Sequence, residues 1–177
     1  MDEATIREHL EKISEDEIVD IANLNCPGQI VISGSRQGIE EAETILKEAG
    51  ARRVIRLNVS GPFHSRLMRP ANEKFQESLD KVTFQDARVP VYANVTAEPV
   101  TDKDEIKELL IQQLYSPVRF EESIRNMMKE GIDAFVELGT GNVLCGLVRK
   151  IDRKQKTFAI QDEKSLAEFL AWYKEEQ

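Results

Sequence analysis

The sequence predicts a mixed α/β fold in two parts, a small α+β subdomain over residues 1–60 and an α/β region over residues 61–177. In the first part, the spacing of apolar residues gives the order helix, strand, strand, helix, strand. In the second part, helical and strand patterns alternate, which favours a largely parallel sheet. Hydrophobic residues make up 41% of the 177 residues, enough for one core or two small ones.

The first helix is expected to begin after Asp2, a residue typical of an N-cap. Strands are expected over residues 18–24 and 29–33, and residues 25–28 supply the Asn, Pro and Gly of a turn between them. We therefore expect these two strands to form a β-hairpin. The apolar residues of the first helix are Ile6, Leu10 and Ile13.

The second helix is expected to begin after Ser35, another N-cap residue, and to stop at Gly50. A third strand is expected over residues 54–59. The resulting order is that of a ferredoxin-like βαββαβ unit without its opening strand. We therefore expect one sheet position to be unpaired and the sequence to begin just after a lost strand.

The pattern continues with a turn at residues 61–62, a helix, and a strand over residues 89–93. Asp102 is the expected N-cap of the next helix, and Pro117 separates that helix from another that ends at Gly131. The apolar positions of these three helices are Leu67, Phe75 and Leu79, then Ile106, Leu109, Leu110 and Leu114, then Ile124, Met127 and Met128.

The last part of the sequence reads as strand, helix, strand, helix. A buried strand is expected over residues 134–138, and residues 139–141 form a Gly-Thr-Gly turn into a helix. A strand follows near residues 157–160, and a closing helix starts at Ser165. The apolar residues of the first of these helices are Val143, Leu144, Leu147, Val148 and Ile151.

Composition and charge exclude several classes of protein. The formal net charge of −8 argues against binding of nucleic acid, because phosphate contacts depend on clustered cations. No apolar run approaches the roughly 20 residues of a membrane-spanning helix, and the start lacks the regions of a signal peptide, so we expect a cytoplasmic protein outside the membrane. Cys26 and Cys145 stand in no metal-ligand spacing, so we expect two reduced thiols and no metal site.

His64 is the natural candidate for a general base. It follows an expected strand and a Gly-Pro turn, a position where α/β proteins commonly expose catalytic side chains. A histidine hydrogen-bonded for structural reasons is the alternative, and the residues alone leave it open. His9, the other histidine, is expected on a solvated helix face.

A general base needs a nucleophile to activate, and the sequence contains no motif for one. The commonest partner on an α/β sheet is the serine of a Gly-x-Ser-x-Gly elbow, which is absent here. Neither cysteine adjoins a motif that marks a nucleophile. The sequence therefore predicts a base without its nucleophile. Ser33, Ser35, Ser60 and Ser65 all lack glycines on both flanks at the spacing of that elbow.

Five segments form a recognisable pattern in order along the chain: residues 25–29 (NCPGQ), 61–65 (GPFHS), 89–94 (VPVYAN), 113–118 (QLYSPV) and 137–144 (ELGTGNVL). Together they resemble the malonyl-CoA:acyl carrier protein transacylases of fatty-acid synthesis. Their combined order and spacing over nearly the whole chain make the resemblance specific. It implies the C-terminal part of an α/β-hydrolase-like acyltransferase domain, preceded by the truncated ferredoxin-like subdomain.

The resemblance implies catalytic roles for two residues. His64 matches the family histidine that takes the proton from the serine during acylation and returns it to the leaving thiol in a ping-pong acyl transfer. Gln113 matches the position whose backbone carbonyl holds the other imidazole nitrogen, which fixes the tautomer without a carboxylate.

The resemblance also implies a substrate cleft. Asn25, Gln29 and Asn94 match polar positions where amides orient the thioester or brace loops. Phe63 resembles the residue of malonyl-selective acyltransferases, where a bulky ring leaves no room for an added methyl group, so malonyl is expected over methylmalonyl.

The departures from the family concern its N-terminal portion, which carries the serine elbow, an arginine for the malonate carboxylate and an oxyanion-hole glutamine. None is present, so the chain alone is expected to be inactive, to associate or be poorly soluble, and to need that portion as a partner. The other implied partners are coenzyme A thioesters and acyl carrier protein, whose acidic surface would dock on Arg52, Arg53 and Arg56. No cofactor is implied beyond the carrier's phosphopantetheine.

Two rival interpretations stay open at this point. One is a stand-alone ferredoxin-like module that binds a small ligand or a partner, which the missing opening strand disfavours. The other is the acyltransferase domain of a multifunctional, polyketide-type synthase, which the absence of a linker at the C-terminus disfavours.

Overall fold

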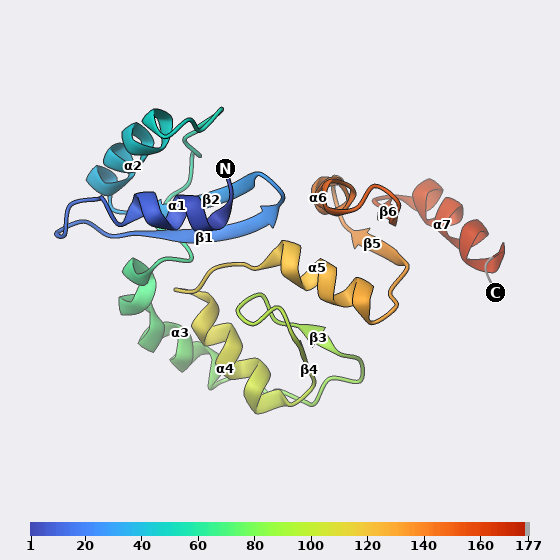
Figure 1. The fold of residues 1–177 in the computed structure, drawn as a ribbon. Coiled ribbons are helices and arrows are strands. Elements are labelled where there is room, and N and C mark those ends of the chain that lie inside the picture. The colour runs from blue at the N-terminus through green and yellow to red at the C-terminus, as the bar shows by residue number, and fades with distance from the viewer. Residues whose placement is uncertain (176–177) are drawn as a thin grey trace. The chain divides into compact units, whose positions relative to one another are not determined.

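The computed structural model describes residues 1–175 and has a mixed α/β fold (Figure 1). The chain divides into two compact units, Met1–Ser123 and a second from Ile124 onward, each described here by itself. The elements are α1 (Glu3–Leu10), β1 (Val19–Cys26), β2 (Gln29–Gly34), α2 (Arg36–Glu48), the 3-10 helix η1 (Arg66–Ala71), α3 (Asn72–Leu79), β3 (Val91–Tyr92), β4 (Pro99–Val100), α4 (Lys103–Gln113), α5 (Phe120–Lys129), β5 (Ala134–Leu138), α6 (Val143–Ile151), β6 (Lys156–Ile160) and α7 (Glu163–Glu175).

The expected hairpin and its two helices are confirmed. β1 and β2 pair antiparallel, and the turn between them is shorter than expected, because Asn25 and Cys26 belong to β1. Ile6 of α1, Ile21 of β1 and Leu46 of α2 form a buried core between the hairpin and the helices. The partly buried residues packed around this core are Leu10, Leu24, Ile30, Ile32 and Ala51.

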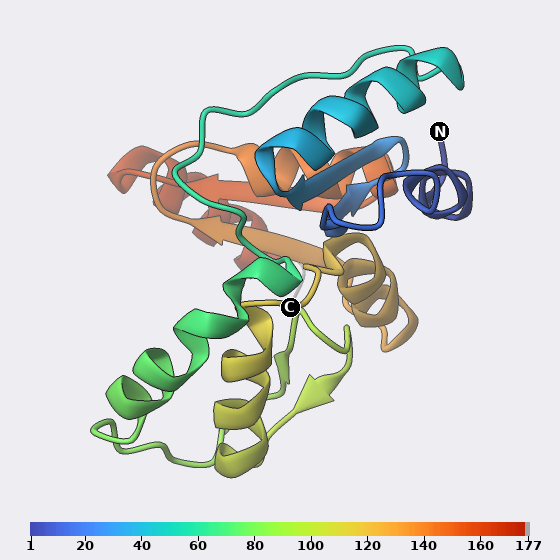
Figure 2. The ribbon, with the colours of Figure 1, turned by 90° about the vertical axis from the view of Figure 1, so that its left-hand side faces the viewer.

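The expected strand over residues 54–59 is wrong. Figure 2 shows the segment as part of a long coil from the end of α2 to η1, and within the described residues it pairs with no strand. Ile55, Leu57 and Val59 alternate along it and are 56%, 57% and 63% exposed. A strand is defined by its ladder, so β-forming residues without a neighbouring strand remain an extended coil.

The middle of the chain contains two packed helices and a short hairpin. Pro70 lies in η1, and α3 follows it, so the single helix expected there is divided in two. α3 and α4 contact each other, as both views show (Figures 1 and 2). The strand expected over residues 89–93 is reduced to β3, which pairs antiparallel with β4 and belongs to no parallel sheet.

The second unit is built from most of α5, followed by β5, α6, β6 and α7. β5 and β6 pair in parallel, in register from Ala134 with Lys156 to Leu138 with Ile160. The rings of Phe158 on β6 and Trp172 on α7 lie 4.6 Å apart and fix α7 against the sheet. β5 was expected to be buried, but Leu138 is 77% exposed, because β6 is its one neighbouring strand in the described part of the chain.

The largely parallel sheet expected for the second part of the sequence is also wrong in extent. Residues 1–175 contain three two-stranded sheets, of which one is parallel. Cys26 and Cys145 are both buried, and neither forms a disulfide in the described residues. No helix of the described residues has the length and apolar character needed to cross a membrane.

Candidate active site

The backbone of His64 adopts a left-handed conformation, with φ at 60°. A residue with a side chain rarely occupies this region, and the surrounding structure has to hold it there. The His64 amide donates to the carbonyl of Leu114 at 3.1 Å, and the fully buried Ser65 donates its hydroxyl to the carbonyl of Pro62 at 2.6 Å. This turn aims the imidazole at the end of α4.

The imidazole of His64 contacts the backbone carbonyl of Gln113, with 2.8 Å between Nδ1 and the oxygen. A carbonyl oxygen only accepts, so Nδ1 carries the proton and donates it. In the neutral ring, Nε2 then has the lone pair. The side chain is therefore held in the tautomer that a general base needs, with no carboxylate as its partner.

The side chain of Gln113 stabilises the turn that presents this carbonyl. Its Nε2 donates to the backbone carbonyl of Ser116 at 3.0 Å. The same Nε2 lies 3.2 Å from Nδ1 of His64, but two donors do not bond each other, so the backbone carbonyl is the partner of the imidazole. Residues 113–116 thus form a closed turn whose open acceptor faces His64.

The segment of residues 113–119 continues from this turn onto β1. Val118 accepts from the amide of Leu24 at 2.9 Å and donates to the carbonyl of Ala22 at 2.8 Å. Pro117 was expected to separate two helices, and the pairing of Val118 with β1 was not predicted. The extended bias of the residue before a proline and the β-branched Val118 are the signals that would have found it.

Arg119 ties the same segment to the loop that contains Asn94. The Arg119 amide donates to the Asn94 carbonyl at 3.0 Å, and its guanidinium donates to the Thr96 carbonyl at 3.1 Å. An ion pair at 2.6 Å with Glu122 holds the guanidinium from the other side. Sequence reasoning missed Arg119, which lies one residue beyond the QLYSPV segment.

The other residues expected in the cleft lie on two elements. Phe63 is 46% exposed beside His64. Asn25 lies near the end of β1 and Gln29 begins β2, so both flank the hairpin turn, and the thiol of Cys26 donates to Oε1 of Gln29 at 3.7 Å. Direct contact joins His64 with Gln113, and the binding roles of Asn25, Gln29, Phe63 and Asn94 stay predictions.

A comparison with protein families identifies the chain. The family described as acyl transferase domain matches residues 2–171. The chain belongs to the acyl transferase domain family. Its matched region includes His64, Gln113 and the whole segment of residues 113–119.

Curated and solved relatives agree with this assignment to the acyl transferase domain family. The chain is 51% identical, over 99% of its length, to a malonyl CoA-acyl carrier protein transacylase of Bacillus subtilis (strain 168) and covers 56% of that protein. The crystal structure of a malonyl CoA-acyl carrier protein transacylase from Clostridium perfringens is 39% identical, with a TM-score of 0.93, over 99% of this chain and 55% of that one.

A third relative is a malonyl-transacylase solved in complex with a type II PKS acyl-carrier protein. It is 34% identical with a TM-score of 0.90, over 94% of this chain and 54% of that one. The chain spans about half the length of the curated relatives it matches.

The three arginines expected to dock a carrier protein, Arg52, Arg53 and Arg56, differ in their surroundings. Arg56 contacts Glu43 at 2.8 Å and Glu40 at 3.6 Å, and its pKa is raised mainly by the hydrogen bond to Glu43. Arg52 and Arg53 are exposed. Arg56 is exposed as well, and the docking role of all three stays a prediction.

The Gly-Thr-Gly turn of the second unit leads into α6, and the first amides of this helix are bound by Glu137. Glu137 on β5 accepts from the amide of Cys145 at 2.9 Å and from that of Leu144 at 3.2 Å. The Cys145 amide is the main cause of the lowered pKa of Glu137, while burial is the main cause of the raised pKa of the Cys145 thiol. A buried thiol with a raised pKa is a poor nucleophile.

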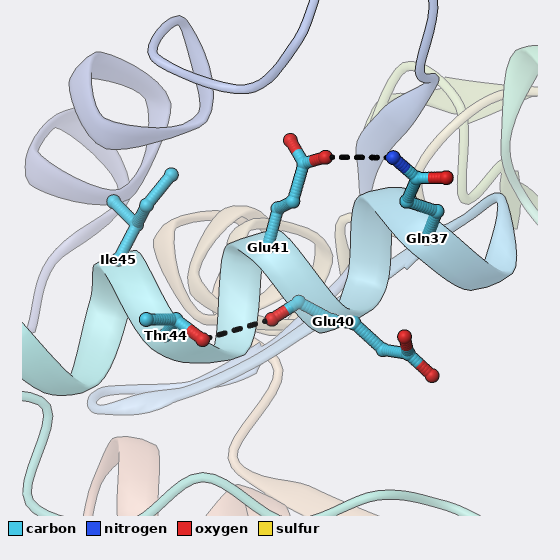
Figure 3. Close-up of a pocket in the computed structure, with 5 residues that line it drawn as sticks. All are labelled: Gln37, Glu40, Glu41, Thr44 and Ile45. Atoms are coloured by element: carbon cyan, nitrogen blue, oxygen red, sulfur yellow. Dashed lines mark hydrogen bonds between the residues drawn. The ribbon is translucent and has the colours of Figure 1, made fainter.

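A surface hollow on α2 contains none of the candidate site residues predicted from the sequence. Figure 3 shows that it is lined by Gln37, Glu40, Glu41, Thr44 and Ile45. Its acidic groups already have partners, because Glu41 accepts from Gln37 and Ser14 and Glu40 pairs with Arg56. We therefore place the candidate active site at His64.

Proposed function

We propose that His64 is the general base and acid in transfer of a malonyl group from coenzyme A to the phosphopantetheine thiol of acyl carrier protein. Support comes from the contact of 2.8 Å between Nδ1 and the Gln113 carbonyl, which leaves Nε2 with the lone pair that the reaction uses. The names of the relatives support the substrates.

The reaction forms an ester on a serine that this sequence does not supply. Nε2 of His64 takes the serine proton as the serine oxygen attacks the thioester carbonyl, and the same proton passes to the coenzyme A sulfur as the carbon–sulfur bond breaks. In the second half, Nε2 takes the proton of the pantetheine thiol, which attacks the ester, and returns it to the serine oxygen. No net proton, metal or redox partner is needed.

The nucleophile, the arginine and the oxyanion-hole donor are proposed to come from an N-terminal portion of the kind that the relatives possess. The exposed apolar row of residues 55, 57 and 59 and the exposed β5 support this partner, because unpaired edges and apolar patches mark surfaces that another segment covers. We expect the chain without that portion to be inactive.

Mass spectrometry of the intact chain after incubation with malonyl-CoA tests this proposal. The chain alone should gain no covalent malonyl group. When the chain is mixed or co-expressed with the N-terminal segment of the Bacillus subtilis relative, the malonyl group should appear on that segment. The variant His64→Ala should abolish this adduct. A stoichiometric adduct on the chain alone would show that one of its own residues is the nucleophile, contrary to the proposal.

The acyl selectivity is proposed to depend on Phe63. Its ring, 46% exposed and next to the base, would fill the space that the methyl group of methylmalonyl-CoA needs. In the reconstituted enzyme, Phe63→Ala should raise the kcat/KM ratio of methylmalonyl to malonyl by about 10-fold or more. An unchanged ratio would remove Phe63 from the substrate cleft.

Carrier-protein docking is proposed at Arg52 and Arg53, with a smaller part for Arg56, whose charge is shared with Glu43. Reversal of Arg52 and Arg53 to Glu should weaken binding of acyl carrier protein to the reconstituted enzyme, and the matched Arg56→Glu should weaken it less. Equal affinities before and after reversal of all three would place the dock elsewhere.

A further inference from the structure

Asp20 on β1 contacts Arg66, which lies two residues beyond His64. It lies between the buried Val19 and Ile21, so its side chain points to the other face of the strand. Its carboxylate is 23% exposed and accepts the backbone amide of Arg66 at 2.8 Å. The guanidinium of Arg66 adds contacts of 2.9 and 3.1 Å.

The hydrogen bond from the Arg66 amide to the Asp20 carboxylate is the contact that constrains the backbone near His64. Arg66 is two residues beyond His64, and the intervening Ser65 is fully buried with its hydroxyl on the Pro62 carbonyl. Fixing the Arg66 amide therefore fixes the far side of the turn in which His64 has its φ of 60°. A left-handed residue persists only where such contacts over-determine it.

β1 also positions the Gln113 carbonyl, the hydrogen-bond partner of His64. Val118 pairs with Ala22 and Leu24 of β1, which sets the position of the Gln113 carbonyl through the closed turn of residues 113–116. Both partners of the hydrogen bond between His64 Nδ1 and the Gln113 carbonyl are thus positioned by β1. The imidazole is positioned through Asp20, and the carbonyl is positioned through Val118.

We propose that Asp20 is a positioning residue that holds the His64 imidazole in its Nδ1-protonated tautomer by accepting the backbone amide of Arg66. This inference deepens the proposed function and rests on it for its catalytic meaning. The competing account is a plain ion pair between Asp20 and the exposed Arg66 guanidinium, which would leave the imidazole unaffected.

The chain itself provides the test, because it contains two histidines with matched contacts. Nδ1 of His9 lies 2.8 Å from the Thr5 carbonyl, so both rings should show a protonated Nδ1 in long-range proton–nitrogen NMR spectra of the neutral form. His9 lies on α1, distant in sequence from the turn, and serves as an internal control for folding.

Four variants separate the backbone contact from the ion pair. Asp20→Ala and Arg66→Pro both remove the backbone hydrogen bond, and proline suits position 66 because it is the first residue of η1 and follows an extended Ser65. Asp20→Asn keeps an oxygen acceptor, and Arg66→Ala keeps the amide donor. The first pair should lose the Nδ1-protonated signature of His64, and the second pair should retain it.

Retention of the signature in Asp20→Ala, or its equal loss in Arg66→Ala, would overturn the proposal. If Asp20→Ala fails to fold, as judged by loss of the His9 signature, the comparison of Arg66→Pro with Arg66→Ala decides the question alone. The readout needs no acyl transfer, so a reconstituted enzyme without malonyl transfer would defeat the proposed function and leave this inference standing.

Discussion

Gly28 and Gly146 meet no atom within 4 Å at the place of an added Cβ, yet they should respond oppositely to alanine. Gly28 has a φ of 75° in the hairpin turn, so Gly28→Ala should lower the free energy of unfolding by about 1 kcal/mol. Gly146 lies inside α6, so Gly146→Ala should raise it by about 0.5–1 kcal/mol.

Urea denaturation followed by circular dichroism measures both changes, with an unchanged m-value as the sign that the native state is intact. Stabilisation by Gly28→Ala would show that the turn does not need its left-handed residue.

Single residues were predictable where their partners are near in sequence. Asp2, Ser35 and Asp102 cap their helices as expected, each accepting an amide two or three residues ahead. His64 was identified by its loop, but its partner at position 113 came from a family resemblance. Asp20 was missed, although a carboxylate within an apolar strand is a signal that it has a specific partner.

At the scale of elements, α6 depends on Glu137, which accepts the amides at its start. The pKa of Glu137 is lowered from its ordinary value of 4.5, so its stabilising contribution is present above that pH and lost as the pH falls through the lower pKa of the folded chain. The glutamine of Glu137→Gln has no charge to lose. This variant should therefore have a lower Tm than the wild type at neutral pH, and the difference in Tm should shrink as the pH falls below 4.5.

Melting curves across this pH range check the prediction, with Glu168→Gln on α7 as the control for loss of one exposed carboxylate. A constant difference in Tm between wild type and Glu137→Gln would mean that the charge of Glu137 is not what holds α6.

The coil of residues 54–59 presents an alternating apolar row without a strand beside it in the described part of the chain. Such a segment is a template for pairing between molecules. Replacing Ile55, Leu57 and Val59 by Thr should therefore reduce self-association in light scattering with little loss of stability. The control is replacement of Leu166 and Leu170, both 42% exposed on α7.

If the control variant reduces association equally, general hydrophobicity rather than this segment is responsible.

Elements were predictable to the extent that their cause is local. Helices that a cap and an apolar stripe predicted were confirmed within a few residues, as for α2 and α4. The strand at residues 54–59 and the burial of β5 were wrong, because both depend on a neighbouring strand that local pattern cannot supply. The pairing of Val118 with β1 was missed for the same reason.

At the scale of the molecule, the two compact units carry separate probes. Cys26 is 2% exposed in the first unit, and the chain's one tryptophan, Trp172, packs on Phe158 in the second. The second unit is small and has an exposed parallel pair of strands, so it should unfold at lower urea concentration. Trp172 fluorescence should therefore change before Cys26 becomes reactive to a thiol reagent.

Labelling of a Cys145→Ser variant isolates the signal of Cys26. Coincident transitions of the two probes would show one cooperative unit instead of two.

The hydrogen bond between His64 and Gln113 joins residues 49 positions apart, and this separation has a meaning for synthesis. At about 5–20 residues per second, a ribosome adds Gln113 roughly 2–10 seconds after His64. During that interval the turn of His64 lacks the carbonyl that orients it, since the loop between them has not closed. In a nascent chain, the tautomer of His64 is therefore not fixed by the Gln113 carbonyl until α4 has been synthesised.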